Sequence, residues 1–440
     1  MYPMTDRLKV DRDLGVCASS GFSAAAVACG IKQSGGPDLA LVVGVPGTLA
    51  AGVFTTNQVV AAPVVWTRAR LAASADARVV VLNAGNANAC TGAAGDAAVL
   101  ATAQRAAAEL GCHPDQVLVC STGVIGVPIE VDCLTEGVAK AAVSLDPGAA
   151  AGTGAADAIR TTDTVVKQAG VHLGAVTVGG MAKGAAMLAP ALGPPSGPPG
   201  TLLGPPHATM LAVLTTDAIV DQATLRAALT SATAATFNRI TVDGAQSTND
   251  TVLLLASGTA GTRLQPRDLA DAVEAVCFDL SGQMLADAEG GTRVVAVHVG
   301  GAGTIAAALA VARRVADSPL VKAAVYGGDS NWGRILQAAG TAGVPFDPSR
   351  VRLEVRGGPG AAGLEAAPTP AQDPGQTQGA AGERVELVRD GAPTGTDGSA
   401  AMAAQEIEFR LDLGGPGPWA CVRTADLTPE YVRLNSAYTT

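Results

Sequence analysis

A chain of 440 residues, 48% hydrophobic and 15% charged, exceeds one ordinary hydrophobic core, so two or three structural units are expected. The same composition excludes a disordered low-complexity protein. The formal net charge of -10 argues against a nucleic-acid partner, because no basic cluster is present to neutralise a phosphate backbone.

Hydrophobic patterning, caps and turn residues predict strands and helices in chain order. A strand at 79–82 precedes an Asn-rich turn, and Asp96 is expected to cap a helix that stops at Gly111. A strand is expected at 117–120, directly followed by Ser121-Thr122-Gly123. Another is expected at 175–178, directly followed by a turn at Gly179-Gly180. Further strands are expected at 210–214, 252–255 and 294–299, and further helices at 225–237, 269–285, 305–315 and 331–339. This is a mixed α/β order without the strict alternation of a doubly wound sheet.

Two segments interrupt the pattern. Residues 190–206 are dense in proline and glycine and cannot form a regular helix or a central strand. Residues 357–382 are rich in Gly, Ala, Pro and Gln, which is typical of a disordered surface insertion. Neither segment is expected to provide a catalytic function by itself.

Three features predict a cytoplasmic location. Residues 1–13 carry charges of both signs and no apolar run, unlike a secretory signal. The longest uncharged run, 294–312, contains His298 and a glycine-rich stretch, so it predicts strand, turn and helix rather than a membrane span. The eight cysteines form no C-x-x-C and share no spacing with histidine, which indicates reduced thiols and no metal site.

The chemistry open to this chain is limited. Its four histidines lie in no hydrolase motif, and no phosphate-binding loop of the G-x-x-x-x-G-K type is present. Acyl chemistry can proceed without histidine when an N-terminal threonine is the nucleophile, because its own α-amine, with a pKa near ~8, acts as the base. Thr209 would reach that state if its hydroxyl attacked the carbonyl of Ala208 and the resulting ester hydrolysed. From composition alone, the same residues also fit a proline-rich loop that enters a strand.

A series of distinctive segments runs along nearly the whole chain. They are GVFTTN at 52–57, NAGNANA at 83–89, STGVIG at 121–126, TTDT at 161–164, KGAAMLAP at 183–190, ATML at 208–211, FNRITVDG at 237–244, STNDT at 247–251, NWGRI at 331–335, YVRLN at 431–435 and YTT at 438–440. Together and in this order they resemble the ornithine acetyltransferase family, also called the arginine biosynthesis bifunctional glutamate N-acetyltransferases.

The resemblance implies a fold and a reaction. The fold is an N-terminal-nucleophile-like αββα sandwich with a smaller C-terminal unit, made as one precursor. Autocleavage would give an α chain of residues 1–208 and a β chain of residues 209–440. The enzyme would move acetyl from N2-acetylornithine to glutamate through an acetyl ester on Thr209. Some members of the family also acetylate glutamate from acetyl-CoA, and the sequence leaves this second activity open.

The resemblance also assigns residues to roles. Thr209 would be the nucleophile, and Thr122 and Gly123 would form the oxyanion hole. Substrate would be bound by one of two adjacent threonines (Thr161 is favoured over Thr162), by Lys183, which suits a carboxylate, by Glu289, which would hold the amino end, and by Asn435 and Thr440 of the C-terminus. No cofactor or metal is implied, and acetyl-CoA would be a co-substrate. The α and β chains are expected to assemble into a heterotetramer or larger.

The chain departs from the family pattern around the expected cut. Ala185-Ala186 replaces the usual Ser-Gly after Lys183-Gly184, about fifteen extra residues precede the cut, and His207 stands where methionine is usual. The insertion can loop out at a small free-energy cost, or it can disturb the geometry that activates the Ala208–Thr209 bond.

Two alternatives to the acetyltransferase stay open at this stage. One is a hydrolase of the same structural group, an aminopeptidase or amidase that releases the acyl group to water. The other is a non-catalytic subunit in which the insertion has abolished processing.

Overall fold

The computed structural model describes residues 8–194, 207–208, 210–363 and 382–437. They form two compact units. Of the described residues, the large unit contains those up to Asn238 together with Ala245–Met284, and the C-terminal unit contains Arg239–Gly244 and those from Leu285 onward.

Two sheets form the centre of the large unit. The four-stranded sheet has the order β1-β2-β4-β5, and the six-stranded sheet has the order β6-β7-β11-β13-β3-β9. A two-residue ladder joins β8 and β10. The strand bounds are β1 Phe22–Val27, β2 Leu39–Gly44, β3 Leu49–Thr55, β4 Val79–Asn86, β5 Val117–Val124, β6 Lys167–Leu173, β7 Val176–Lys183, β8 Leu188–Ala189, β9 Leu192–Gly193, β10 His207–Ala208, β11 Leu211–Thr216 and β13 Thr251–Ala256.

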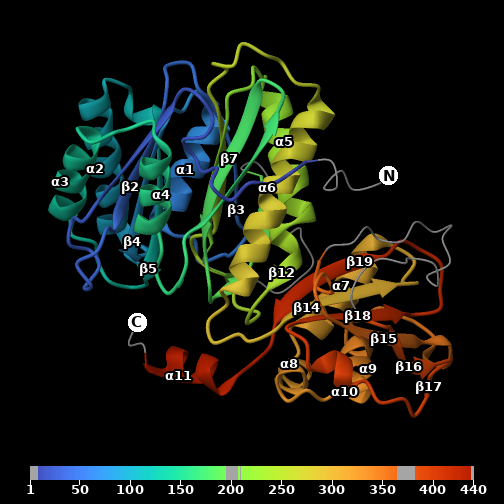
Figure 1. Cartoon of the computed structure of the whole chain (residues 1–440). Coiled ribbons are helices and arrows are strands. Elements are labelled where there is room, and N and C mark those ends of the chain that lie inside the picture. Colours follow the sequence, from blue (N-terminus) through green and yellow to red (C-terminus); the bar gives the residue numbers. More distant parts are fainter. Residues whose placement is uncertain (1–7, 195–206, 209, 364–381, 438–440) are drawn as a thin grey trace. The chain divides into compact units, whose positions relative to one another are not determined.

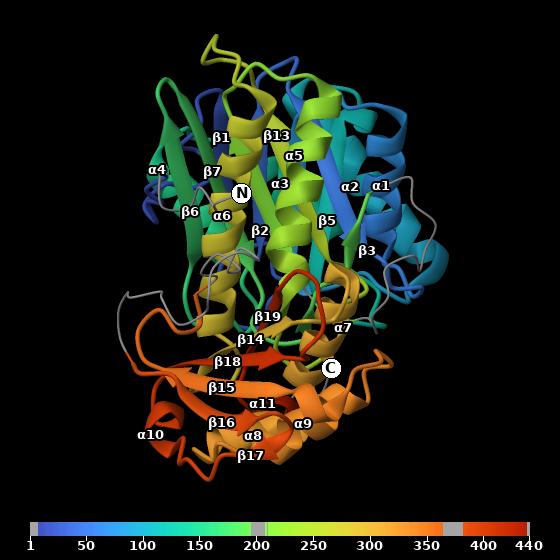
Figure 2. The ribbon, with the colours of Figure 1, turned by 90° about the vertical axis from the view of Figure 1, so that its right-hand side faces the viewer.

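Helices pack on these two sheets. The helix bounds are α1 Ala62–Ala73, α2 Gly92–Leu110, α3 Val131–Ala142, α4 Ala149–Ala158, α5 Gln222–Ala235 and α6 Pro266–Ala286, with short 3-10 turns at Pro114–Gln116 and Phe237–Arg239. Helices α2 and α3 pack on the four-stranded sheet, and α5 and α6 lie across the six-stranded sheet (Figures 1 and 2). Between the sheets, one core joins Phe22, Leu118 and Met181, all at most 1% exposed. The layers therefore follow the order α-β-β-α, which confirms the predicted fold class.

The C-terminal unit is a seven-stranded sheet with helices packed on it. The strand order is β12-β19-β14-β18-β15-β16-β17, and α7 packs on β14 and β19 (Figure 2). Its elements are β12 Ile240–Thr241, β14 Val294–Gly300, α7 Ile305–Ala316, α8 Pro319–Tyr326, α9 Trp332–Gly340, a 3-10 turn Pro348–Arg350, β15 Arg352–Gly357, β16 Val385–Arg389, β17 Ala392–Pro393, α10 Ser399–Met402, β18 Glu406–Asp412, β19 Ala420–Ala425 and α11 Pro429–Ala437.

The long uncharged run at 294–312 is strand, turn and helix, as the sequence predicts, because β14 ends at Gly300 and α7 begins at Ile305. Within the described ranges, no helix combines the length and the apolar character needed to span a bilayer. Of the predicted insertion at 357–382, Gly357 belongs to β15, and residues 364–381 lie outside the described part.

Four sequence predictions were wrong at their boundaries. Strand β4 does not end at Leu82 but runs through the first residues of the expected Asn-rich turn to Asn86. Strand β5 does not end before Ser121 but runs on through Gly123 to Val124, and β7 runs through the expected turn at Gly179-Gly180. Gly179 is needed for close approach instead, since a Cβ there would lie 2.2 Å from the carbonyl oxygen of Gly15. Helix α2 begins at Gly92, so Asp96 lies inside its first turns and is not its cap.

Candidate active site

The expected oxyanion residues lie at an irregular point where β4 and β5 pair in parallel. The register shifts at Gly85 and Asn86, opposite Gly123. Gly123 has a φ of 131°, and a Cβ on it would lie 2.3 Å from the carbonyl carbon of Gly85. Only glycine fits this close contact and this positive φ, so the backbone N–H of residue 123 has an orientation that no other residue would reproduce without strain.

Asparagine side chains hold this irregular region in place. Asn83 Nδ2 donates to the carbonyl oxygen of Asn86 at 2.8 Å, and Ser121 Oγ donates to Asn83 Oδ1 at 2.6 Å. Asn249, two residues before β13, donates from Nδ2 to the carbonyl oxygens of Ala87 at 2.6 Å and Ser121 at 2.8 Å. The asparagines at the end of β4 and the STNDT segment thus link the ends of the two sheets next to Thr122.

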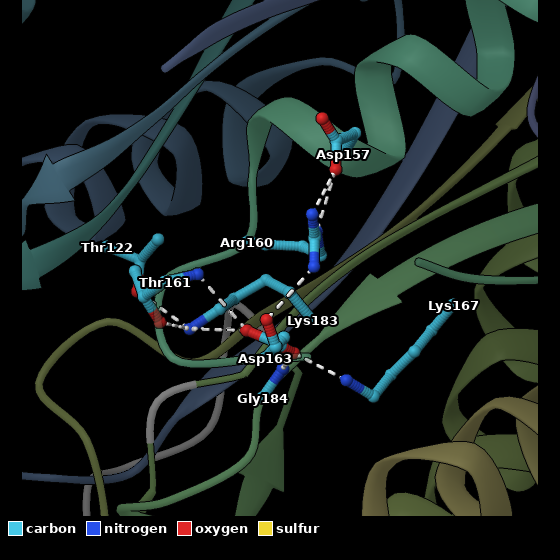
Figure 3. A network of polar contacts seen from close by, with 8 residues as sticks. All are labelled: Thr122, Asp157, Arg160, Thr161, Asp163, Lys167, Lys183 and Gly184. Carbon is cyan, nitrogen blue, oxygen red and sulfur yellow. Dashed lines mark hydrogen bonds and ion pairs between the residues drawn. The ribbon is translucent and has the colours of Figure 1, made fainter. Parts of the chain in front are cut away.

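Lys183 is the last residue of β7, and its side chain is buried. Its ammonium donates to Thr161 Oγ1 at 2.7 Å and approaches Thr122 Oγ1 at 3.3 Å (Figure 3). The structure therefore brings together three residues that the resemblance selects from three separate segments. A lysine ammonium has only donors, so each threonine oxygen accepts from it and keeps its own O–H for another acceptor.

Asp163 is a central residue that the sequence analysis did not select. Its Oδ1 accepts from Lys167 Nζ at 2.7 Å and from the N–H of Gly184 at 2.7 Å, and its Oδ2 lies 3.9 Å from Lys183 Nζ (Figure 3). Burial alone would raise the pKa of Asp163, but the charges of Lys183 and Lys167 and the bond from Gly184 outweigh it and lower the pKa to about 2. The sequence feature that could have identified Asp163 is its position in the TTDT segment, two residues after Thr161.

A second layer of contacts fixes the loop that carries Asp163. Arg160 donates from Nη1 to the carbonyl oxygen of Asp163 at 3.1 Å and from Nε to Asp157 Oδ1 at 2.8 Å (Figure 3). The N–H of Thr161 donates to Asp163 Oδ2 at 3.1 Å. Thr162 shows no hydrogen bond to Lys183 within the described part of the chain, so only Thr161 of the two threonines is held beside that lysine.

The expected cleavage point directly follows β10. Ala208 pairs with Leu188, and His207 pairs with Ala189. This two-residue ladder joins the residues just before the insertion to the residues just after it. Thr209 lies outside the described residues. The next residue, Met210, is buried and donates its N–H to Asp250 Oδ1 at 2.6 Å. Leu211, the first residue of β11, is the register partner of Lys183.

Glu289 and Asn435 belong to the C-terminal unit. Asn435 lies on α11 and donates from Nδ2 to Glu289 Oε2 at 2.9 Å, so these two expected binding residues contact each other. On the same helix, the Tyr431 hydroxyl donates to Asp243 Oδ2 at 3.3 Å. Thr440 lies outside the described residues. No group of His, Cys, Asp and Glu within the described ranges has the arrangement of a metal site.

Comparisons with known proteins place this chain in a family. The sequence model of the ArgJ family matches residues 23–440. The arginine biosynthesis bifunctional protein ArgJ of Mycobacterium leprae (strain TN) is 44% identical over 97% of this chain and 96% of its own length. The protein of the same name from Mycobacterium tuberculosis (strain ATCC 25618 / H37Rv) is 44% identical over 100% of both chains.

A solved structure also matches. It is the ornithine acetyltransferase of Mycobacterium tuberculosis complexed with ornithine, 50% identical, with a TM-score of 0.41, covering 42% of this chain and 100% of that chain. The family match and the full-length identity to curated relatives decide the assignment. This chain belongs to the ArgJ family, the bifunctional acetyltransferases of arginine biosynthesis.

Proposed function

We propose that this chain transfers acetyl from N2-acetyl-L-ornithine to L-glutamate by ping-pong catalysis through an acetyl ester on Thr209. Thr209 becomes an N-terminus when the bond to Ala208 is cut. The observation that carries this proposal is the group of Thr122, Thr161 and Lys183, because Lys183 is the register partner of Leu211, two residues after Thr209.

In the first half-reaction, Thr209 Oγ adds to the acetyl carbonyl of acetylornithine. The Oγ proton passes to the Thr209 α-amine and then to the ornithine nitrogen as the amide bond breaks. The negative oxygen that forms is stabilised by the O–H of Thr122 and the N–H of Gly123, a contribution worth about 10²–10³ in rate per donor. In the second half-reaction, the amine of glutamate attacks the acetyl ester and releases Thr209.

The charges in the site support the binding of an amino acid. The Lys183 ammonium is buried, contacts Asp163 and Thr161, and lies at the end of β7. Both proposed substrates carry an α-carboxylate. A substrate carboxylate at Lys183, with the Thr161 hydroxyl as a further donor, would form a charge-assisted hydrogen bond. Glu289 and Asn435 would hold the substrate's amino end, and Thr440 would complete the site.

The proposed cut would not release the two chains from each other. Strands β7 and β11 lie on opposite sides of it in sequence and pair over six register positions, from Lys183 with Leu211 to Val178 with Thr216. The α chain of residues 1–208 and the β chain of residues 209–440 would thus share one sheet. Their association into a heterotetramer or larger assembly, and a cytoplasmic location, complete the proposal.

One experiment separates this function from its alternatives. Purified protein is incubated with N-acetylornithine, with and without glutamate, and acetylglutamate and acetate are measured. We expect acetylglutamate to form and little acetate to appear. Acetate released at full rate without glutamate would indicate a hydrolase, and a single chain near 43.4 kDa with no product would indicate an unprocessed subunit. Acetyl-CoA in place of acetylornithine tests the second activity.

The insertion before the cut gives a separate prediction. Replacing residues 195–206 with about six Gly and Ser residues should leave the cleavage rate within about threefold of the native rate, because halving a loop changes its closure free energy by only about 0.6 kcal/mol. The β8–β10 ladder that positions Ala208 lies outside the replaced residues. The appearance of two fragments on a denaturing gel measures the rate. Complete loss of cleavage would mean that the inserted residues take part in the reaction.

A further inference from the structure

Asp250 lies beside the proposed cleavage point. It directly precedes β13, whose first residue, Thr251, is the register partner of Leu211. The side chain is fully buried, and its Oδ1 accepts the N–H of Met210 at 2.6 Å. Met210 N belongs to the peptide unit that joins Thr209 to Met210. The carboxyl group is therefore hydrogen-bonded to an atom that is about three covalent bonds from the nitrogen of Thr209.

The second carboxyl oxygen of Asp250 is buried, and within the described part of the chain it has no hydrogen-bond partner. A buried unpaired carboxylate would be very unfavourable. Burial raises the pKa of Asp250 well above its usual range, although the amides of Met210 and Ser247 and the charge of Lys183 act in the opposite direction. Burial therefore favours the protonated carboxylic acid, and the second oxygen, which has no hydrogen-bond partner among the described residues, is placed to carry the proton.

We propose that Asp250 is the proton carrier for cleavage of the Ala208–Thr209 bond, an inference that rests on the proposed function. As Thr209 Oγ adds to the carbonyl carbon of Ala208, the acid on Asp250 protonates the departing Thr209 nitrogen. The C–N bond breaks, an ester joins Ala208 to Thr209 Oγ, and the proton lost by Oγ returns to Asp250. Water then hydrolyses the ester, giving the Ala208 carboxylate and the free hydroxyl and amine of Thr209.

The order of events requires such a group. The α-amine that serves as base in acetyl transfer does not exist before the cut, because the nitrogen of Thr209 is then an amide. An amide nitrogen leaves only when it is protonated, and a positioned general acid or base contributes about 10²–10⁴ in rate. The protonated form of Asp250, which is hydrogen-bonded to the Met210 N–H, would supply this proton to the Thr209 nitrogen.

The test is Asp250→Asn in the full chain. Asparagine has nearly the same shape and keeps an oxygen that accepts the Met210 N–H, but it has no acidic proton. We expect cleavage to slow by about 10²–10⁴, with the chain remaining near 43.4 kDa. The urea midpoint should match that of the uncut Thr209→Ala protein, which separates loss of the acid from misfolding.

Hydroxylamine identifies the affected step, because it cleaves esters but not ordinary amides. If Asp250 acts in ester formation, hydroxylamine should not speed the cutting of Asp250→Asn. Rapid cutting by hydroxylamine would mean that the ester forms without Asp250, and would overturn the proposal.

A matched control is Asp217→Asn. Asp217 is also buried and directly follows the other end of β11, where it accepts from the N–H groups of Ser20 at 3.0 Å and Thr177 at 2.8 Å. This variant should cleave at the native rate. If the native chain is cut after Ala208 and Asp250→Asn is cut equally fast, the inference on Asp250 fails while the proposed function stands. If the native active protein is itself uncut, the proposed function fails.

Discussion

Thr209→Ala is expected to leave the chain as a single species near 43.4 kDa and to reduce acetyl transfer by at least about 10⁴-fold. The variant removes the hydroxyl that would attack Ala208 and would later carry the acetyl group. It also prevents formation of the α-amine that would act as base. Both losses come from one oxygen atom, so cleavage and turnover should disappear together. A denaturing gel and an acetylglutamate assay on the same preparation measure them.

Thr209→Ser is the matched control. Serine keeps the hydroxyl and, once cut, the amine, so we expect two fragments and measurable transfer. Mass analysis of the new N-terminus should place it at residue 209 in the native chain and in this variant. An active Thr209→Ala protein, or active native enzyme with an intact Ala208–Thr209 bond, would show that another group carries the acetyl.

Asp163→Asn should lower the free energy of unfolding by about 3–5 kcal/mol, the usual cost of removing one partner from a buried ion pair. The substitution would leave the side chains of Lys167 and Lys183, 0% and 3% exposed, without their shared carboxylate. The Thr209→Ala background keeps the chain whole, so urea unfolding reports on one molecule. Acetyl transfer, measured without the Thr209 change, should fall as well, because Asp163 holds Lys183 and the N–H of Thr161.

The control for this prediction is Asp157→Asn. Asp157 pairs with Arg160 in the same network, but their side chains are 38% and 28% exposed, so solvent screens the pair and its loss should cost no more than about 1 kcal/mol. Equal urea midpoints for the Asp163 and Asp157 variants would show that the buried network does not stabilise the large unit.

The pH dependence of stability follows from the same carboxylate. The pKa of Asp163 is lowered to about 2 in the folded chain, against roughly 3.9 in an unfolded one. A lowered folded pKa stabilises the protein above the unfolded pKa, and this contribution is lost as pH falls from about 4 to about 2. Urea midpoints measured across that range should fall less steeply in Asp163→Asn than in its parent.

Local sequence was sufficient for those elements that have a clear hydrophobic pattern and clear end signals. Strand β14 and helix α7 follow from an apolar run broken by glycines. Helix α2 ends at Gly111 as the sequence predicts, and the structure shows this glycine in the left-handed conformation. The same reasoning failed at Gly179 and Gly123, which look like turn residues in sequence. Each is a glycine because another backbone segment passes too close for a Cβ, and that neighbour is distant in sequence or on another strand.

By itself, the sequence determined the α/β class, the family and those elements with clear local patterning, because these depend on local periodicity and on ordered motifs. Only the tertiary structure decided which side chains meet. Thr122 and Lys183 are 61 residues apart, and Met210 and Asp250 are 40 apart, and strand register and burial bring each pair together. The tertiary structure also decided that the pKa of Asp163 is lowered and that of Asp250 is raised, because both are buried acids and only the first lies between two cations.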